Sequence, residues 1–187
     1  MMVSAMSDSI SIRRLLRSDA EQYRAFRLAA LAATPSAFTS SAEEEGQKPL
    51  SWFADKIGDA DQSTHFILGA FQNGAELVGV IGCDVEARRQ ACHKATLFGM
   101  AVATHAHGRG IGRALVQRLL SEARQIPGVL QVILTMSEGN IAGERLYRSC
   151  GFREFGREPR ATLIAGQAIT KISMVHMFDD FPWTPVS

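Results

Sequence analysis

Glycines and arginines between an apolar strand pattern and an amphipathic helix pattern are the residues best suited to chemistry in this chain. Gly108, Gly110 and Gly112 lie where the helical pattern begins, with Arg109 and Arg113 beside them. The first N–H groups of a helix lack partners within the helix, and the helix dipole adds partial positive charge there. Glycines leave these amides open to a phosphate, and arginines add mobile positive charge. The sequence therefore predicts a site for a phosphorylated cofactor.

Two commoner phosphate-binding loops are excluded by spacing. A Rossmann fingerprint, G-x-G-x-x-G, needs a glycine where Arg113 or Leu115 stands, depending on the starting glycine. No Walker A string, G-x-x-x-x-G-K-[ST], occurs in the chain. The segment from His107 to Gly112 instead resembles the pyrophosphate loop of the GNAT acetyltransferase superfamily, usually written Q/R-x-x-G-x-G/A. His107 stands where glutamine or arginine is usual, and we expect it to donate through its backbone.

A second segment supports this resemblance. Residues 140–152 are similar to the later superfamily motif N-x-x-A-x-x-L-Y-x-x-x-G-F, with Gly143 in place of the usual alanine. That glycine lowers local helix stability by about 1 kcal/mol. An apolar run, residues 129–136, lies between the two motifs and predicts a buried strand. The motif-bearing core covers residues 64–158, and shorter segments are similar to one bacterial branch of the superfamily: 35–38, 93–95 and 158–161.

The resemblance implies a role for each motif residue. Tyr147 would be the catalytic proton donor to the thiolate that leaves when an amine attacks a thioester. The amides of residues 109–113 would bind the pyrophosphate of acetyl-CoA, and residues 100–102 would offer a main-chain edge to its pantetheine arm. Asn140 either caps its helix or contacts the cofactor. The predicted cofactor-binding residues are Met100, Ala101, Val102, His107, Gly108, Arg109, Gly110, Ile111, Gly112, Arg113 and Asn140.

The general base for the acceptor amine is not fixed by the sequence. Many members of this superfamily carry a glutamate on the strand before the pyrophosphate loop, but residues 93–102 contain no carboxylate. The alternatives are a water chain or one of four side chains, Asp84, Glu86, His93 and Glu138. A thiol near the cofactor would suit a covalent acyl relay, but the place of Cys150 at the end of a helix favours apolar packing.

The same resemblance implies an α/β fold with one domain, residues 10–180, after a disordered N-terminal tail, residues 1–9. We expect a central mixed, mostly antiparallel twisted sheet of about seven strands with flanking helices. Two parallel strands, 97–102 and 132–136, would splay apart and hold the pantetheine arm between them. The splay leaves backbone groups unpaired, and the amides of that arm would supply partners.

Local patterns place the elements. Strands are predicted at 9–16, 65–72, 76–86, 93–102, 129–136, 152–156 and 167–177, and helices at 18–33, 41–59, 110–125 and 141–150. The second helical region is interrupted near residues 46–49, and its acidic run, residues 43–45, is interpreted as a solvated helix start. Residues 159–166 are expected to be irregular, and Gly79 and Gly82 to mark a bulge or a close backbone contact.

Composition argues against several classes of protein. Lysine plus arginine (20) nearly balance aspartate plus glutamate (19), so no basic field favours nucleic acid. No apolar run reaches membrane-spanning length, and the N-terminus lacks the pattern of a signal peptide. Three cysteines without a secretion signal favour reduced thiols in the cytoplasm. Five histidines without metal-type spacing predict no metal.

We therefore predict an N-acetyltransferase that moves an acetyl group from acetyl-CoA to a primary amine by direct attack in a ternary complex. The alternative is a non-catalytic acetyl-CoA sensor or regulatory module, because no base is evident. Residues 34–47 and 158–167 would shape the acceptor site, and a small molecule and a peptide both stay open. Acidic residues in these segments favour a cationic amine, and a homodimer is left open.

Overall fold

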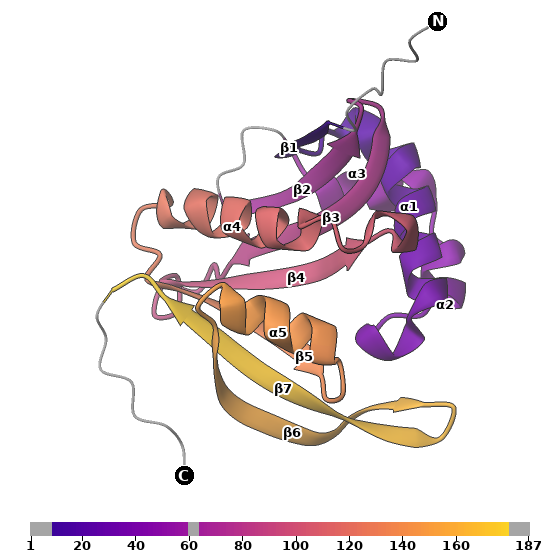
Figure 1. Ribbon diagram of the computed structural model, residues 1–187. Coiled ribbons are helices and arrows are strands. Elements are labelled where there is room, and N and C mark those ends of the chain that lie inside the picture. The colour runs from indigo at the N-terminus through magenta and orange to yellow at the C-terminus, as the bar shows by residue number, and fades with distance from the viewer. Residues whose placement is uncertain (1–8, 60–63, 180–187) are drawn as a thin grey trace, which may run out of the picture.

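A seven-stranded sheet organises the part of the chain that the computed structural model describes, residues 9–59 and 64–179. Its strands lie in the order β1-β2-β3-β4-β5-β7-β6 (Figure 1). The strands are β1 (Ile10–Arg14), β2 (His65–Gln72), β3 (Glu76–Val85), β4 (Lys94–Val102), β5 (Gln131–Ser137), β6 (Arg153–Ile164) and β7 (Gln167–Met177). The helices are α1 (Ala20–Ala33), α2 (Ala42–Gly46), α3 (Leu50–Ile57), α4 (Ile111–Arg124) and α5 (Ile141–Ser149), with 3-10 turns η1 (Arg17–Asp19), η2 (Pro35–Ala37) and η3 (Thr104–Ala106).

Neighbouring strands in the described sheet are antiparallel except for β4 and β5, which run parallel. This confirms the predicted mixed α/β fold with a mostly antiparallel sheet, one parallel pair and flanking helices. β2 and β3 are buried along nearly their whole length. Strands covered on both faces have this near-continuous apolar pattern.

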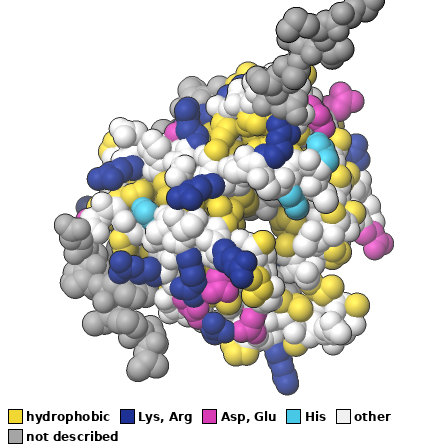
Figure 2. Space-filling model, viewed as in Figure 1, with side chains coloured by type: hydrophobic (Ala, Val, Ile, Leu, Met, Phe, Trp, Pro, Cys, Tyr) yellow, Lys and Arg dark blue, Asp and Glu magenta, His cyan; other side chains and the backbone are white. Residues whose placement is uncertain are grey.

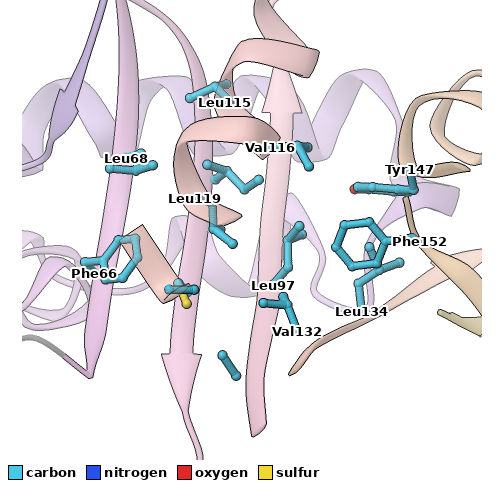
Figure 3. Packing of buried hydrophobic residues seen from close by; sticks show 14 of the residues in the cluster. Phe66, Leu68, Leu97, Leu115, Val116, Leu119, Val132, Leu134, Tyr147 and Phe152 are labelled. Atoms are coloured by element: carbon cyan, nitrogen blue, oxygen red, sulfur yellow. The ribbon is translucent and has the colours of Figure 1, made fainter. Parts of the chain in front are cut away.

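Helices cover the two faces of the sheet and form two hydrophobic clusters. α4 and α5 lie on one face, where Leu115 and Leu119 of α4 belong to the same buried cluster as Leu97 of β4 (Figure 3). α1 and α3 lie on the other face, where the rings of Tyr23 and Phe53 meet edge-on with centroids 6.2 Å apart. The buried stripe of α4 follows the helical period that its sequence shows.

β4 and β5 are paired only where the two strands begin. Their parallel ladder joins Lys94–Thr96 to Gln131–Ile133, and the described residues beyond it form no further pairs between these strands. β4 nevertheless continues to Val102 and β5 to Ser137. The carboxyl-terminal halves of the two strands therefore diverge, as the predicted splay requires.

A β-bulge in β4 accounts for this divergence. The pairing of β4 with β3 shifts by one residue between Phe98 and Ala101, and Gly99 adopts a left-handed conformation with φ of 62°. An extra residue of this kind bends its strand and increases the local twist. The expected feature at Gly82 is a close contact, because a ring atom of Phe98 lies 2.3 Å from where a Cβ would be. Gly79 borders a second bulge, where β3 pairs with β2.

The last hairpin differs from its prediction. β6 runs without interruption to Ile164, so the irregular segment predicted at residues 159–166 is wrong. A bulge admits Pro159, because the pairing with β7 shifts there and Arg160 takes a positive φ of 53°. Residues 165–166, also at positive φ, form the tight turn into β7.

The predicted N-terminal tail, residues 1–9, lies outside the described residues except for Ser9. Residue 180, the predicted end of the domain, lies outside them as well. Within the described ranges, no helix is both long and apolar enough to cross a membrane.

Candidate active site

The amino-terminal end of α4 is open, as the glycines before it predict. Gly108 and Gly110 have φ values of 75° and 76°, a left-handed conformation that costs residues with a Cβ about 1–2 kcal/mol. No side chain caps the helix, and the described residues give no backbone acceptor to the N–H groups of Ile111, Gly112 and Arg113. A Cβ at Gly108 or Gly110 would meet no atom within 4 Å. These amides can therefore receive an anion.

Gly112 serves packing. A Cβ at this position would lie 3.1 Å from Cε of Met100 and 3.3 Å from Cδ2 of Leu146. The missing side chain lets α4 approach β4 and α5 closely, which fixes where the helix begins. The third glycine of the loop thus positions the anion site, and its contact with the cofactor stays a prediction.

His107 and Arg109 fasten the loop to the sheet. Nε2 of His107 lies 2.9 Å from the carbonyl oxygen of Val102, and its backbone N–H donates to the carbonyl of Thr104 at 3.2 Å. The backbone donor of His107 is therefore already engaged in this structure. Nη1 of Arg109 donates to Oε1 of Gln72 at the end of β2, at 2.8 Å. Cofactor contacts by these two residues stay predictions.

The edge of β4 that faces β5 lies beside this loop. In the described residues, 100–102 have no partner from β5, while Ala101 and Val102 keep their pairs with β3. Figure 2 shows the surface hollowed between β4 and α5, at the end where α4 begins. A ligand that carries amide groups can add to such an edge as an extra strand would.

Tyr147 lies on α5, on the same side of the sheet as α4. It is 8% exposed, and its hydroxyl is directed toward Val116 of α4 (Figure 3). Its ring meets Phe152 edge-on at 5.8 Å, and no described residue hydrogen-bonds to its hydroxyl. Burial raises the pKa of Tyr147 to about 12, with a smaller contribution from Cys150. The phenol therefore stays protonated at neutral pH, as a proton donor must.

Asn140 takes one of the two roles left open for it. Its Oδ1 accepts a hydrogen bond from the backbone N–H of Gly143 at 3.0 Å, so it caps α5. A Cβ at Gly143 would lie 2.7 Å from Nδ2 of Asn140. Glycine in place of the usual alanine therefore makes room for this cap, and a contact between Asn140 and the cofactor stays a prediction.

The cysteines and histidines form no evident reactive centre in the described ranges. Cys150 is half-buried and packs against the core, as the packing interpretation expects. Burial raises the pKa of Cys83 to about 12, so its thiol is unreactive at neutral pH. Among residues 9–59 and 64–179, no three His, Cys, Asp or Glu side chains gather where they could hold a metal ion.

The four predicted candidates for the general base differ in position. Glu86 and His93 lie between β3 and β4, at the far end of β4 from the bulge. Asp84 lies on β3, and Nδ1 of His65 lies 3.0 Å from its carboxylate. Glu138 follows the diverging end of β5, but its carboxylate lies 2.5 Å from the guanidinium of Arg157.

A charged side chain is buried at a position that the sequence predicts to be exposed to solvent. Glu45 is 3% exposed, so its interpretation as part of a solvated helix start is wrong. Arg27 of α1 donates two hydrogen bonds to its carboxylate, at 2.9 and 3.0 Å. Burial alone would raise the pKa of Glu45, but these bonds and the charges of Arg27 and Lys56 hold it below its ordinary value. No local signal separates Glu45 from its two acidic neighbours.

A second buried polar pair joins β5 to β7. Nζ of Lys171 donates to Oγ of Ser137 at 2.9 Å, and the Ser137 hydroxyl donates to the carbonyl of Ser36. Burial lowers the pKa of Lys171. No carboxylate in the described residues lies within 4.0 Å of its ammonium group. Neither residue was among the predicted site residues, because only strand register brings them together.

Solved structures share this architecture. An acetyltransferase of the GNAT family from Streptococcus pneumoniae has a TM-score of 0.78, with 22% identity, over 91% of this chain and 100% of that one. A putative acetyltransferase from Salmonella typhimurium, solved with its cofactor acetyl-CoA, has a TM-score of 0.73, with 19% identity, over 96% of this chain and 99% of that one. At these identities the likeness shows the fold.

Sequence comparison gives the family. N-acetyltransferase 8B of Rattus norvegicus is 32% identical over 87 residues, which are 46% of this chain and 39% of that protein. The match thus spans well under half the length of that relative. The model of the acetyltransferase (GNAT) family matches residues 23–152, which include the glycine-rich loop, the diverging strands and Tyr147. The predicted membership is confirmed: this chain belongs to the GNAT family of acetyltransferases.

Proposed function

We propose that this protein transfers an acetyl group from acetyl-CoA to a primary amine by direct attack in a ternary complex. One observation carries the proposal: α4 has an open amino terminus, the end of β4 before it has no partner from β5, and Tyr147 lies on α5, which contacts α4. Family membership and the acetyl-CoA named with the Salmonella structure support the cofactor. A cytoplasmic location stays a prediction, and a homodimer stays open.

The residues at this place fit acetyl-CoA. Gly108 and Gly110 leave open space where a Cβ would stand, so a diphosphate can reach the amides of residues 111–113. The main chain of residues 100–102 would pair with the two pantetheine amides. One of its N–H groups would also donate to the thioester carbonyl oxygen and stabilise the negative charge that develops there. Acetyl-CoA, when bound, supplies the acetyl group as a thioester.

Tyr147 would give its hydroxyl proton to the thiolate that leaves when the acceptor nitrogen displaces it. The C–S bond breaks as the C–N bond forms, the nitrogen loses its extra proton to solvent, and solvent returns a proton to the phenol. The acceptor must also arrive as a free amine. We assign the removal of its proton to water, because three predicted base candidates lie elsewhere and Glu138 is paired with Arg157.

Release of free thiol from acetyl-CoA, with amines of several classes as acceptors, tests the proposal. Tyr147→Phe should lower kcat about 100-fold and leave the Kd for acetyl-CoA unchanged by calorimetry, because the phenol acts on the leaving group. Tyr23→Phe is the matched control, since Tyr23 is also buried, has a pKa raised to about 12 and lies on the other face of the sheet. Tight binding without thiol release in any reaction would favour the non-catalytic module. Absence of acetyl-CoA binding would refute both functions.

A further inference from the structure

The described residues bury four polar or charged side chains, Arg27, Glu45, Ser137 and Lys171, and all lie on the side of the sheet away from Tyr147. Alternate residues of β5 pack into the cluster beneath α4, so Ser137, one position further, faces the opposite side. Lys171 is its register partner on β7 and shares that side. Nη1 of Arg27 would lie 3.9 Å from a Cβ on Gly99, at the β4 bulge.

Residues 36–38 connect these groups. The carbonyl of Ser36 accepts the hydrogen bond from Ser137, and the ring of Phe38 lies 4.8 Å from the Arg27 guanidinium. This short segment therefore spans from α1 to the carboxyl end of β5. The buried polar groups thus border the gap between β4 and β5 from the side opposite α4.

Positive charge is in excess at this border. Glu45 is balanced by Arg27, and Lys56 adds a second cation 3.7 Å from the same carboxylate. Lys171 has only the Ser137 hydroxyl as a polar partner in the described residues, and Nη1 of Arg27 has no hydrogen-bond partner there. A buried charge without a counter-ion is costly, and lysine is almost never fully buried without one.

Glu158 is the nearest alternative counter-ion for Lys171 in the sheet. It is the register partner of Lys171 on β6 and lies on the same side. The two side chains nevertheless form no ion pair within 4.0 Å, and Glu158 is exposed. Glu158 therefore does not neutralise the charge of Lys171 in this structure.

We propose that the acceptor is a small amine that also carries a carboxylate, and that Lys171 and Nη1 of Arg27 bind this carboxylate. The inference rests on the proposed acetyl transfer and names the substrate class for it. Charge-assisted hydrogen bonds to the two cations would hold the acid end away from the gap and leave the amine facing the thioester. Ser137 is a positioning residue, because it fixes the Lys171 side chain.

The same cations make other acceptor classes unfavourable. A polyamine or an aminoglycoside would bring further positive charge against Arg27, Lys56 and Lys171. Nearby positive charge also lowers the pKa of an acceptor ammonium, which favours the neutral amine that attacks. The expectation of a cationic amine rested on an acidic run whose buried member, Glu45, is already paired, and the proposed acceptor adds a carboxylate to that amine.

Matched acceptors test the inference. The purified protein is given acetyl-CoA and each standard amino acid beside its own carboxamide, with spermidine and kanamycin as carboxylate-free amines. The best amino acid should exceed its carboxamide at least about tenfold in kcat/KM, because the amide keeps the shape and loses the charge. Acetyl-CoA binding, measured separately by calorimetry, separates this inference from the proposed function. A protein that binds acetyl-CoA but acetylates no amino acid, or acetylates the carboxamides or spermidine as well, overturns the inference.

Lys171→Met adds a readout that a purely structural role would not give. It should lower kcat/KM for the amino acid at least about tenfold through KM, leave the slower carboxamide reaction within about threefold, and raise the Tm of the unliganded protein. Lys171→Arg should recover part of the loss. Lys94→Met, at the far end of β4 from the bulge, is the control and should leave both reactions unchanged. A lowered Tm with equal losses for acid and carboxamide would assign Lys171 to the fold alone.

Discussion

Removing Arg27 should expose the energetic cost of a buried carboxylate. Arg27→Met takes away both hydrogen bonds to Glu45, which is 3% exposed and keeps only Lys56, 3.7 Å away, as a charged neighbour. Breaking a buried pair by deleting one partner costs about 3–5 kcal/mol. Because Lys56 remains, we expect the lower part of that range, a loss of about 3 kcal/mol. That is a large fraction of the roughly 5–15 kcal/mol that keeps a domain folded.

Urea unfolding of three proteins measures this loss. Wild type and Arg27→Met are compared with the double variant Arg27→Met/Glu45→Leu, in which the charge and its partner are both replaced by apolar side chains of similar volume. The double variant should recover most of the free energy of unfolding, because no unpaired charge is left in the core. An equal loss in the single and double variants would show that Arg27 contributes through packing rather than through its charge.

The direction in which stability changes with pH tests the Arg27–Glu45 ion pair independently. In the wild type the pKa of Glu45 is held below its ordinary value, so its contribution is present above the unfolded-state pKa and is lost as the pH falls through the folded-state pKa. In Arg27→Met, burial acts largely unopposed and the pKa of Glu45 should rise above its ordinary value. The deficit of the variant should therefore shrink between pH 8 and pH 5. A deficit that stays constant over this range, or one below about 1 kcal/mol, would refute this account of the ion pair.

Three further outcomes follow from the site. Gly110→Ala should lower the free energy of unfolding by about 1–2 kcal/mol, because φ is 76° and the added Cβ meets no atom within 4 Å, so only the backbone conformation is penalised. Gly46→Ala, also in open space but on α2, is the control in the same urea titration. Asn140→Ala should cost about 1 kcal/mol through the lost cap. Calorimetry of the same variant tests the predicted contact: a weaker Kd for acetyl-CoA would support it, and an unchanged Kd would leave the cap as the role of Asn140. The pH profile of kcat should show no alkaline fall below about pH 10, since the pKa of Tyr147 is raised to about 12; a fall near pH 8 would point to another acid.

Local chemistry explains which parts of the site the sequence predicts. The open start of α4 follows from Gly108 and Gly110, whose positive φ values reflect a preference that glycine has in any protein. The cap of α5 is similarly local, since Asn140 and Gly143 are three residues apart. The resemblance to one superfamily then supplies the parallel pair of strands and the proposed role of Tyr147, which no pattern within the chain determines.

Tertiary contacts explain what the sequence does not predict. Glu45 is buried because α2 packs against Arg27, 18 residues earlier in the chain, while its acidic neighbours stay exposed. Ser137 and Lys171 meet only through strand register, and Ser137 is also held by a hydrogen bond to Ser36 of η2. Pro159 suggests the end of a strand, yet a bulge two strands from the parallel pair absorbs it. Each case depends on which element lies opposite, and a single sequence does not contain that information.

The two faces of the sheet carry different groups of the proposed site, and the bulge at Gly99 lies where the sheet between them opens. The side of α4 offers uncapped amides and a protonated phenol, which suit a diphosphate and a leaving thiolate. The opposite side offers buried cations, which suit the acid end of an acceptor. A continuous sheet would keep these groups apart, because β4 and β5 would pair along their whole length. The bulge at Gly99 follows the three residues that pair, and under the proposed reaction the gap beyond them would let groups on the two sides act on one bond.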